Sequence, residues 1–420
     1  MAKSRNQIWL AVIVVPPALL FAFIMGLYGY MNATKTPLHP DPTAVPSVTH
    51  SAPLPKWADT VEQARQLVRA SLVEQNLPGL SVAVGADGEI VWAEGFGLAD
   101  LEKRTPVAPA TLFRVADASK ALTSVAVGLL LEKDKLHLDD EIQVHVPEFP
   151  KKQWPVTLHQ LMAQVAGART DAGDEAPLSS NVVSDEGKFV GRCERTVDGL
   201  QMDRFAEREL LFEPGTKYSP SSYGWILVSA AVEAAADEPF FTFMRKQIFE
   251  PLGMRDTTID LWTEPIPNRA TFYFPRFAGD TRYGPQSVRQ GDHSCYAGAG
   301  AFLSTPADLV RFGLAVRSDK LLKPATIDML QTPQTLASGE ETGYGLGWRL
   351  ESVLLAGHPT QMAGHGSKAD FIGGTTYLMT FPERGIVVAV MTNTSFADTK
   401  SVALSVAQAF AEQGRSPARE

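Results

Sequence analysis

One segment constrains the fold more than any other: residues 113–120, of sequence FRVADASK. No charged side chain occurs in the residues that follow it, from Ala121 to Leu131, which is typical of a helix buried on all sides. Aspartate is among the best residues at a helix N-terminus, so Asp117 is expected to cap this helix. The rest of the chain is therefore expected to fold around it.

Hydrophobic patterning places strands near both ends of the folded region. Residues 79–84 and 90–93 are β-rich runs around an Asp-Gly turn, and residues 375–381 and 386–391 flank a second turn. Between the two strand regions the chain is largely helical. The pattern predicts an α/β (α+β) fold, with an antiparallel sheet flanked by helices plus a mostly helical lobe at about 117–290 and a cleft between them.

The N-terminal residues 1–31 carry an apolar run from Ile8 to Leu27, long enough to cross a bilayer as a helix. A cleaved signal peptide is the alternative, but no clear cleavage site of small residues follows the run. Lys3 and Arg5 precede it, which predicts a cytoplasmic N-terminus. We therefore expect a single-pass inner-membrane protein whose body faces the periplasm or a mitochondrial intermembrane space.

The remaining chain divides by composition. Residues 32–56 are rich in proline, threonine and serine, which predicts an extended linker that buries no core. The folded body is expected over residues 57–413, with a polar surface loop at about 166–199 and a short tail at 414–420.

Composition excludes several kinds of function. The net charge of −9 argues against nucleic-acid binding, which requires a basic face. Cys193 and Cys295 are the only cysteines, and they form neither a metal-ligand cluster nor a disulfide framework; a single bridge between them stays open. No phosphate loop or zinc motif occurs, so no cofactor or metal is predicted.

Several further stretches resemble the serine β-lactamase and penicillin-binding-protein-like hydrolases of the class C, peptidase S12 type. Within this group they are most similar to the branch that contains the mitochondrial serine β-lactamase-like proteins and their bacterial relatives. Besides FRVADASK, the matching stretches are LPGLSVAV (77–84), KLHLDD (135–140), VPEFP (146–150), EPGTK (213–217), NRA (268–270), AGAGAFLST (297–305) and YGLGW (344–348).

The resemblance implies acyl transfer by a serine that opens the central helix in a Ser-x-x-Lys motif. Here Asp117 stands in the place of that serine, while Lys120 keeps the place of the lysine. A carboxylate one turn away favours the charged ammonium, so the exchange removes the nucleophile and also hinders lysine from acting as a base. Ser119 is no replacement, because two residues rotate it by roughly 200° around the helix.

The family's second and third motifs are altered as well. In the segment KYSPSSYGW (217–225), Pro220 takes the place of the catalytic tyrosine, and Tyr218 and Tyr223 take flanking aromatic places, where packing is the simpler interpretation. In AGHGS (363–367), His365 matches the family histidine, and Ser367 replaces a glycine.

Two functions remain open. The first is a membrane-tethered pseudoenzyme that binds a ligand in the old cleft, binds another envelope protein, or self-assembles. The second is an active serine-hydrolase-type enzyme, a peptidase, esterase or β-lactamase-like protein, with a rebuilt site. In the second, Asp117 acts as base with His365 and a serine such as Ser221, Ser222 or Ser367.

Overall fold

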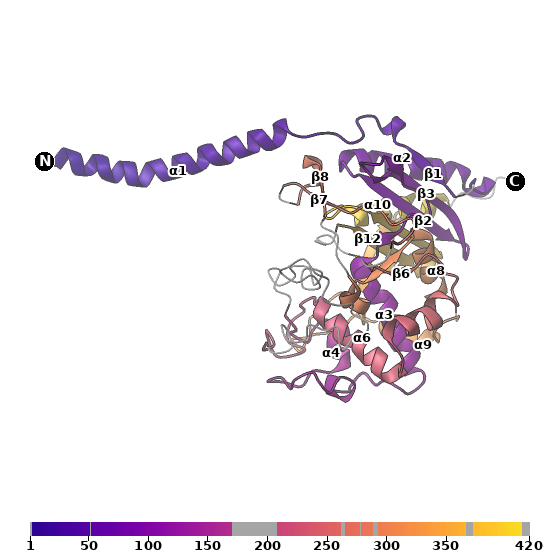
Figure 1. Cartoon of the computed structure of the whole chain (residues 1–420). Helices are drawn as coiled ribbons and strands as arrows, with labels where there is room; N and C mark the ends of the chain where they lie inside the picture. The colour runs from indigo at the N-terminus through magenta and orange to yellow at the C-terminus, as the bar shows by residue number, and fades with distance from the viewer. Residues whose placement is uncertain are drawn as a thin grey trace.

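The computed structural model describes residues 2–50, 52–169, 208–261, 265–277, 279–288, 293–316, 318, 320–366 and 373–413 (Figure 1). Its main feature is an antiparallel sheet in the order β1-β3-β2-β13-β12-β11-β10, with β4 paired to β3. The strands are β1 (Ser47–Thr49), β2 (Gly79–Ala86), β3 (Glu89–Asp100), β4 (Thr105–Pro106), β10 (Arg349–Leu355), β11 (His358–Gly366), β12 (Thr375–Phe381) and β13 (Ile386–Thr392). The predicted sheet built from both ends of the chain is confirmed.

Both predicted hairpins are present. β2 and β3 join at Asp87 and Gly88, whose φ values of 54° and 80° are those of a tight turn that matches the twist of a hairpin. β12 pairs with β13 from Thr375–Thr392 to Phe381–Ile386. The central join is β13 against β2, which runs from Val387–Gly85 to Thr392–Leu80 and brings the two ends of the chain together.

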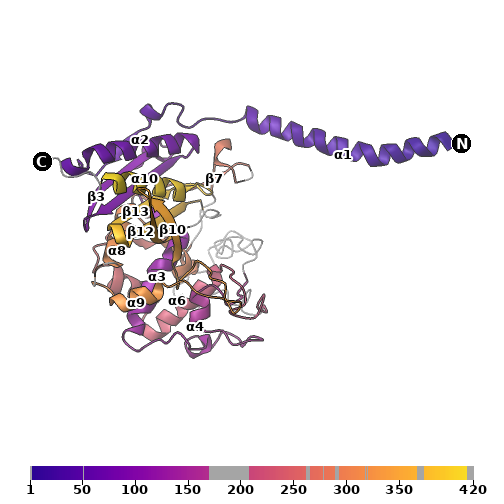
Figure 2. The same ribbon diagram turned by 180° about the vertical axis from the view of Figure 1, so that it is seen from behind.

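Helices cover both faces of this sheet (Figures 1 and 2). On one face lie α2 (Ala58–Glu74) and α10 (Thr399–Gln413), which pack against each other and against the strands. On the other face lies α8 (Pro306–Val316). Every residue of β13 is buried: Val388 and Val390 face α2 and α10, while Val387 and Ala389 face the larger core beneath.

The larger core belongs to the lobe below the sheet. At its centre α3 (Ser119–Leu131) is buried along almost its whole length, which confirms the helix predicted from its lack of charge. Around it lie α4 (Leu158–Met162), α6 (Ser222–Ala236), α7 (Phe240–Met244), a π-helix η6 (Arg245–Phe249) and α9 (Pro324–Leu330). The lobe also contains short strands: β5 (Phe113–Arg114), β6 (Thr258–Ile259) and β9 (Phe302–Ser304) form one sheet, and β7 (Tyr273–Pro275) pairs with β8 (Pro285–Ser287).

The N-terminal segment differs from expectation. Helix α1 (Ala2–Ala33) projects away from the body (Figure 1). The sequence predicted a membrane span here, but within the described ranges no helix combines the length and apolar character needed to cross a bilayer.

The segment expected to be a free linker, residues 32–56, in fact packs on the body. Strand β1 pairs with the edge of β3, and Val45 is buried in the core beneath α2 and α10. His39 is also buried, with Nε2 3.2 Å from the carbonyl oxygen of Pro78. Proline-rich composition predicted exposure, but an open sheet edge offers backbone partners that composition does not reveal.

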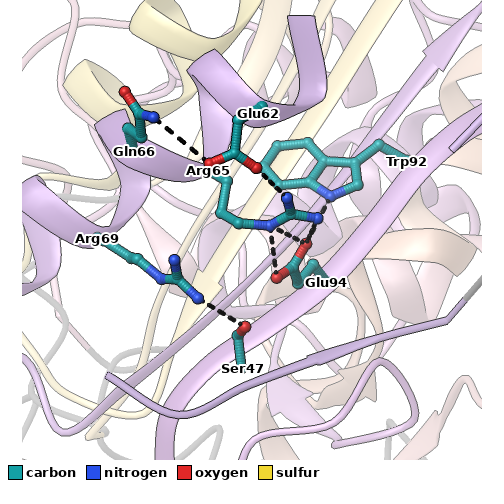
Figure 3. Close-up of polar contacts among 7 residues, drawn as sticks. All are labelled: Ser47, Glu62, Arg65, Gln66, Arg69, Trp92 and Glu94. Carbon is teal, nitrogen blue, oxygen red and sulfur yellow. Dashed lines mark hydrogen bonds and ion pairs between the residues drawn. The ribbon is translucent and has the colours of Figure 1, made fainter. Parts of the chain in front are cut away.

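A buried carboxylate joins α2 to the sheet near this edge. Glu94 on β3 is 1% exposed, and both of its oxygens accept hydrogen bonds from Arg65 Nε at 3.0 Å (Figure 3). One of these oxygens also accepts the indole N–H of Trp92 at 3.0 Å. On its outer side Arg65 pairs with exposed Glu62. Glu94 therefore satisfies the buried indole N–H of Trp92 and the half-buried guanidinium of Arg65 at once.

We predict that Glu94→Ala lowers the free energy of unfolding by about 2–4 kcal/mol, because it leaves the buried indole N–H without its acceptor and leaves Arg65 with only its exposed partner Glu62. Urea unfolding monitored by circular dichroism measures this loss. The matched control is Glu62→Gln, which removes the exposed partner of the same arginine and is expected to cost less than about 1 kcal/mol. Equal losses in the two variants would contradict the importance of the buried carboxylate.

Candidate active site

Asp117 and Lys120 are placed by a sharp turn between a strand and the central helix. Strand β5 ends at Arg114, a short 3-10 turn η3 (Ala116–Ala118) follows, and α3 begins at Ser119. Ala116 has a φ of 52°, in the left-handed region that a residue with a side chain rarely adopts. Such strain is commonly kept where a side chain must be presented at a functional position.

Arg114 of the FRVADASK segment holds this turn from below. Its Nε donates to Asp260 at 2.6 Å, both side chains are buried, and the guanidinium lies over the ring of Phe272. The carbonyl oxygen of Arg114 accepts a hydrogen bond from Thr376 on β12 at 2.7 Å. The arginine thus attaches the start of the helix to the sheet, which is a structural task.

The altered position Asp117 and the retained lysine of the first motif contact each other directly. Lys120 Nζ donates to Asp117 Oδ1 at 2.5 Å; the lysine side chain is 2% exposed and the aspartate side chain 24%. The ion pair predicted from the sequence is therefore confirmed. The predicted helix cap is wrong: the residue before α3 is Ala118, which makes no capping bond. Asp117 lies within the preceding turn, and its carboxylate is directed to the lysine.

Asp117 stays ionised in this setting. Burial raises the pKa of its carboxyl, but the positive charge of Lys120, with a smaller effect from Arg349, outweighs burial. The net pKa lies below the usual value of 3.8. A carboxylate with so low a pKa is a weak base near neutral pH. The carboxylate is therefore poorly suited to accept the proton of a hydroxyl.

His365 comes from β11, which packs against η3 and α3. It is fully buried, and its Nε2 lies 2.8 Å from the hydroxyl oxygen of Tyr344. Its Nδ1 is buried without a hydrogen-bond partner among the described residues. Burial holds the pKa of His365 well below 6.5, Lys120 and Arg349 act in the same direction, and Asp117 opposes them. The ring is therefore neutral near pH 7.

The second motif offers no proton relay. Pro220 is exposed just before α6, and the next residue, Ser221, is that helix's N-cap, with its hydroxyl accepting from Gly224 N at 3.1 Å. Tyr223 is buried in the lobe core, as expected for a packing residue. Tyr218 packs its ring 5.6 Å from that of Tyr344, and its hydroxyl is buried without a hydrogen-bond partner among the described residues.

Burial raises the pKa of Tyr218, and the negative charge of Asp117 adds to this effect. Both tyrosines on this side of the site are therefore protonated near neutral pH, since the pKa of Tyr344 is also raised well above 10 by burial.

Among the described residues, none of the serines Ser119, Ser221 and Ser222 has a hydrogen bond to Lys120. Ser119 is fully buried inside the lobe, Ser221 is occupied as a cap, and Ser222 opens α6. Ser367 and Cys193 lie outside the described residues, as does nearly all of the loop expected at 166–199. In the described part of the chain no three metal-binding side chains lie together.

Sequence reasoning missed two side chains of the site. Tyr344 was read only as part of the YGLGW stretch, yet it binds His365 directly. Arg349 follows that stretch on β10, and its positive charge lowers the pKa of Asp117, Tyr218 and Tyr344. The signal was proximity in sequence to a stretch shared with the family, although nothing in the sequence indicated that these residues lie near His365 and Asp117.

Comparison with known proteins decides the family. A family model described as Beta-lactamase matches residues 64–411, which is most of the chain. The chain belongs to the beta-lactamase family. It is 30% identical to the serine beta-lactamase-like protein LACTB, mitochondrial, of Homo sapiens over 84% of this chain and 80% of that protein. It is 26% identical to penicillin-binding protein 4* of Bacillus subtilis (strain 168), over 65% of this chain and 59% of that protein.

Solved structures show the same fold. The octameric penicillin-binding protein homologue from Pyrococcus abyssi superposes with a TM-score of 0.67 at 24% identity, covering 82% of this chain and 76% of that one. EstCE1, a hydrolase with promiscuous acyltransferase activity, superposes with a TM-score of 0.67 at 21% identity, covering 84% and 98%. The scaffold of this family is thus intact around an altered first motif.

We predict that stability depends on pH through His365. The unfolded chain takes up a proton at this ring below about pH 6.5, whereas the folded protein keeps it neutral. The free energy of unfolding is therefore unaffected by this ring above about pH 6.5. Below that pH it falls by about 1.4 kcal/mol per pH unit, because only the unfolded chain takes up the proton. In His365→Gln, the loss of unfolding free energy between about pH 7.5 and pH 5.5 should shrink by about 1.4 kcal/mol relative to the wild type.

Urea unfolding at the two pH values measures this difference. His137→Gln is the control for replacing a histidine by glutamine elsewhere in the chain, because the side chain of His137 is 59% exposed. An identical pH dependence in His365→Gln and the wild type would show that His365 is protonated in the folded protein as readily as in the unfolded chain.

Proposed function

We propose that this protein is a catalytically inactive member of the beta-lactamase family that works by binding in the former catalytic cleft. One observation carries the proposal: Asp117 occupies the place of the nucleophile and is bonded to Lys120 at 2.5 Å. The pair satisfies both charges internally, and attack on a carbonyl has no hydroxyl to begin from. The second change, Pro220 in place of the tyrosine, supports the same conclusion.

The site nonetheless keeps buried polar atoms that a ligand could satisfy. Tyr218 Oη and His365 Nδ1 are both buried and without partners among the described residues, and Arg349 lends the site positive potential. Buried polar groups in native proteins are normally hydrogen-bonded, because an unsatisfied one costs about 1–3 kcal/mol. A polar ligand that accepts from Tyr218 would remove one such cost. Binding of such a ligand would explain why these polar side chains are retained after acyl transfer has been lost.

Two further parts of the proposal concern partners and location. Self-assembly, or contact with another protein of the envelope, would let the same scaffold act through its surface. The names of the three mammalian relatives describe those proteins as mitochondrial. For this chain we propose a compartment beyond an inner membrane, either the periplasm or the intermembrane space.

A rebuilt hydrolase is the alternative, favoured by the survival of Lys120 and His365 on neighbouring elements. It requires slow ester or peptide turnover that disappears in both Asp117→Asn and His365→Ala. Absence of turnover in the wild type, or activity that persists in both variants, removes this alternative.

We predict that the full chain gains no mass when it is incubated with a penicillin-type β-lactam or a fluorophosphonate probe, because neither finds an activated hydroxyl. Intact-mass spectrometry measures the adduct directly. The double change Asp117→Ser with Pro220→Tyr restores both oxygens and should recover some labelling, whereas Asp117→Ser alone leaves proton transfer incomplete and should label less. Stoichiometric labelling of the wild type would overturn the proposal.

A further inference from the structure

A cavity of about 270 Å³ lies in the helical lobe, apart from the Asp117–Lys120 pair. It opens between α7, the π-helix η6 and strand β6, with β9 behind it. Its lining is Phe241, Thr242, Arg245, Phe249, Thr257, Thr258, Ile259 and Phe302. None of these residues belongs to the three family motifs.

The inner wall of this cavity is aromatic. Phe302 is fully buried, and the rings of Phe241 and Phe249 meet it edge-on at centroid distances of 5.9 and 5.2 Å. Ile259 adds an aliphatic side, paired with Phe302 across β6 and β9. Edge-to-face aromatic walls of this kind are suited to a further aromatic ring, which can extend the same arrangement.

The outer rim is polar and carries one cation. Arg245 opens the π-helix, its side chain is 64% exposed, and its nearest acidic partner, Glu250, is 3.7 Å away and equally exposed. The hydroxyl-bearing side chains of Thr242 and Thr258 share this rim. Thr257 is already engaged, with its hydroxyl 2.9 Å from Asp308 Oδ2. An exposed and loosely paired guanidinium is free to bind a carboxylate in bidentate geometry.

The π-helix brings the cation of Arg245 next to the aromatic wall of the cavity. Its wider turn, in which Glu250 N donates to Arg245 O at 2.9 Å, places Arg245 and Phe249 along one wall of the cavity. Single π turns of this kind occur preferentially at functional sites. The volume of the cavity limits the size of a ligand. A dry cavity of about 150 Å³ holds benzene, so the present cavity has room for a phenyl ring and a short tail.

We propose that this cavity is a second ligand site, which binds a small arylalkyl carboxylate with its ring against Phe241, Phe249 and Phe302 and its carboxylate on Arg245. The site does not depend on the function proposed for the cleft. The cavity is nevertheless linked to the turn that carries Asp117. The carbonyl oxygen of Phe302 accepts the backbone N–H of Val115, two residues before Asp117, at 2.8 Å.

The test uses the full chain and 3-phenylpropionate as the probe, with calorimetry or ligand-observed NMR as the measurement. A ligand of this size should bind with a Kd of about 0.1–1 mM. Thr258→Trp fills the mouth and should weaken binding at least about tenfold; Arg245→Gln removes the cation and should weaken it about fivefold. The alcohol 3-phenyl-1-propanol should bind the wild type more weakly than the acid and be insensitive to Arg245→Gln.

The matched control is Lys246→Gln, which removes the neighbouring cation that pairs with Glu238 at 2.8 Å and does not line the cavity. It should leave the Kd unchanged. Because Arg245 is a surface residue, its variant tests the proposal even if Thr258→Trp fails to fold. No binding at about 10 mM, or binding that Arg245→Gln leaves unaltered, would overturn the proposal.

Discussion

The contact between Asp117 and Lys120 determines what the rest of this structure can do. Lys120 is nearly completely buried, so its ammonium needs a negative partner within reach, and Asp117 supplies it at 2.5 Å. The same carboxylate takes the place from which a hydroxyl would attack. One side chain thus partners the buried lysine at the start of the central helix and, in the function proposed above, removes the chemistry that this position serves in the family.

The surroundings of the pair are those of an intact scaffold. Arg114 and Asp260 attach the turn to the lobe, and the hydroxyl of Thr376 attaches it to the main sheet. His365 lies on the strand beside it and remains neutral, held by Tyr344. Selection for a folded scaffold without acyl transfer, as we propose, would leave this combination: complete supports, with Asp117 and Pro220 at the two places where the family carries its reacting hydroxyls.

The sequence predicted the sheet and the central helix because both depend on apolar periodicity over many residues. It also predicted the ion pair, because three residues along a helical turn bring two side chains together. It failed where tertiary contacts override local signals: residues 32–56 pack on the sheet edge despite their prolines, and Asp117 bonds Lys120 rather than capping the helix. Tyr344 and Arg349 were missed for the same reason, since only the folded chain brings them near His365 and Asp117.

A double-mutant cycle on the ion pair tests the central claim most directly. The unfolding free energies of the wild type, Asp117→Asn, Lys120→Met and the double variant give the coupling between the two side chains. If the pair stabilises the fold, each single change costs about 2–4 kcal/mol, and the double change costs at least about 2 kcal/mol less than their sum. Additive losses, with no coupling between the two changes, would contradict the account. They would show that the contact between Asp117 and Lys120 does not stabilise the fold.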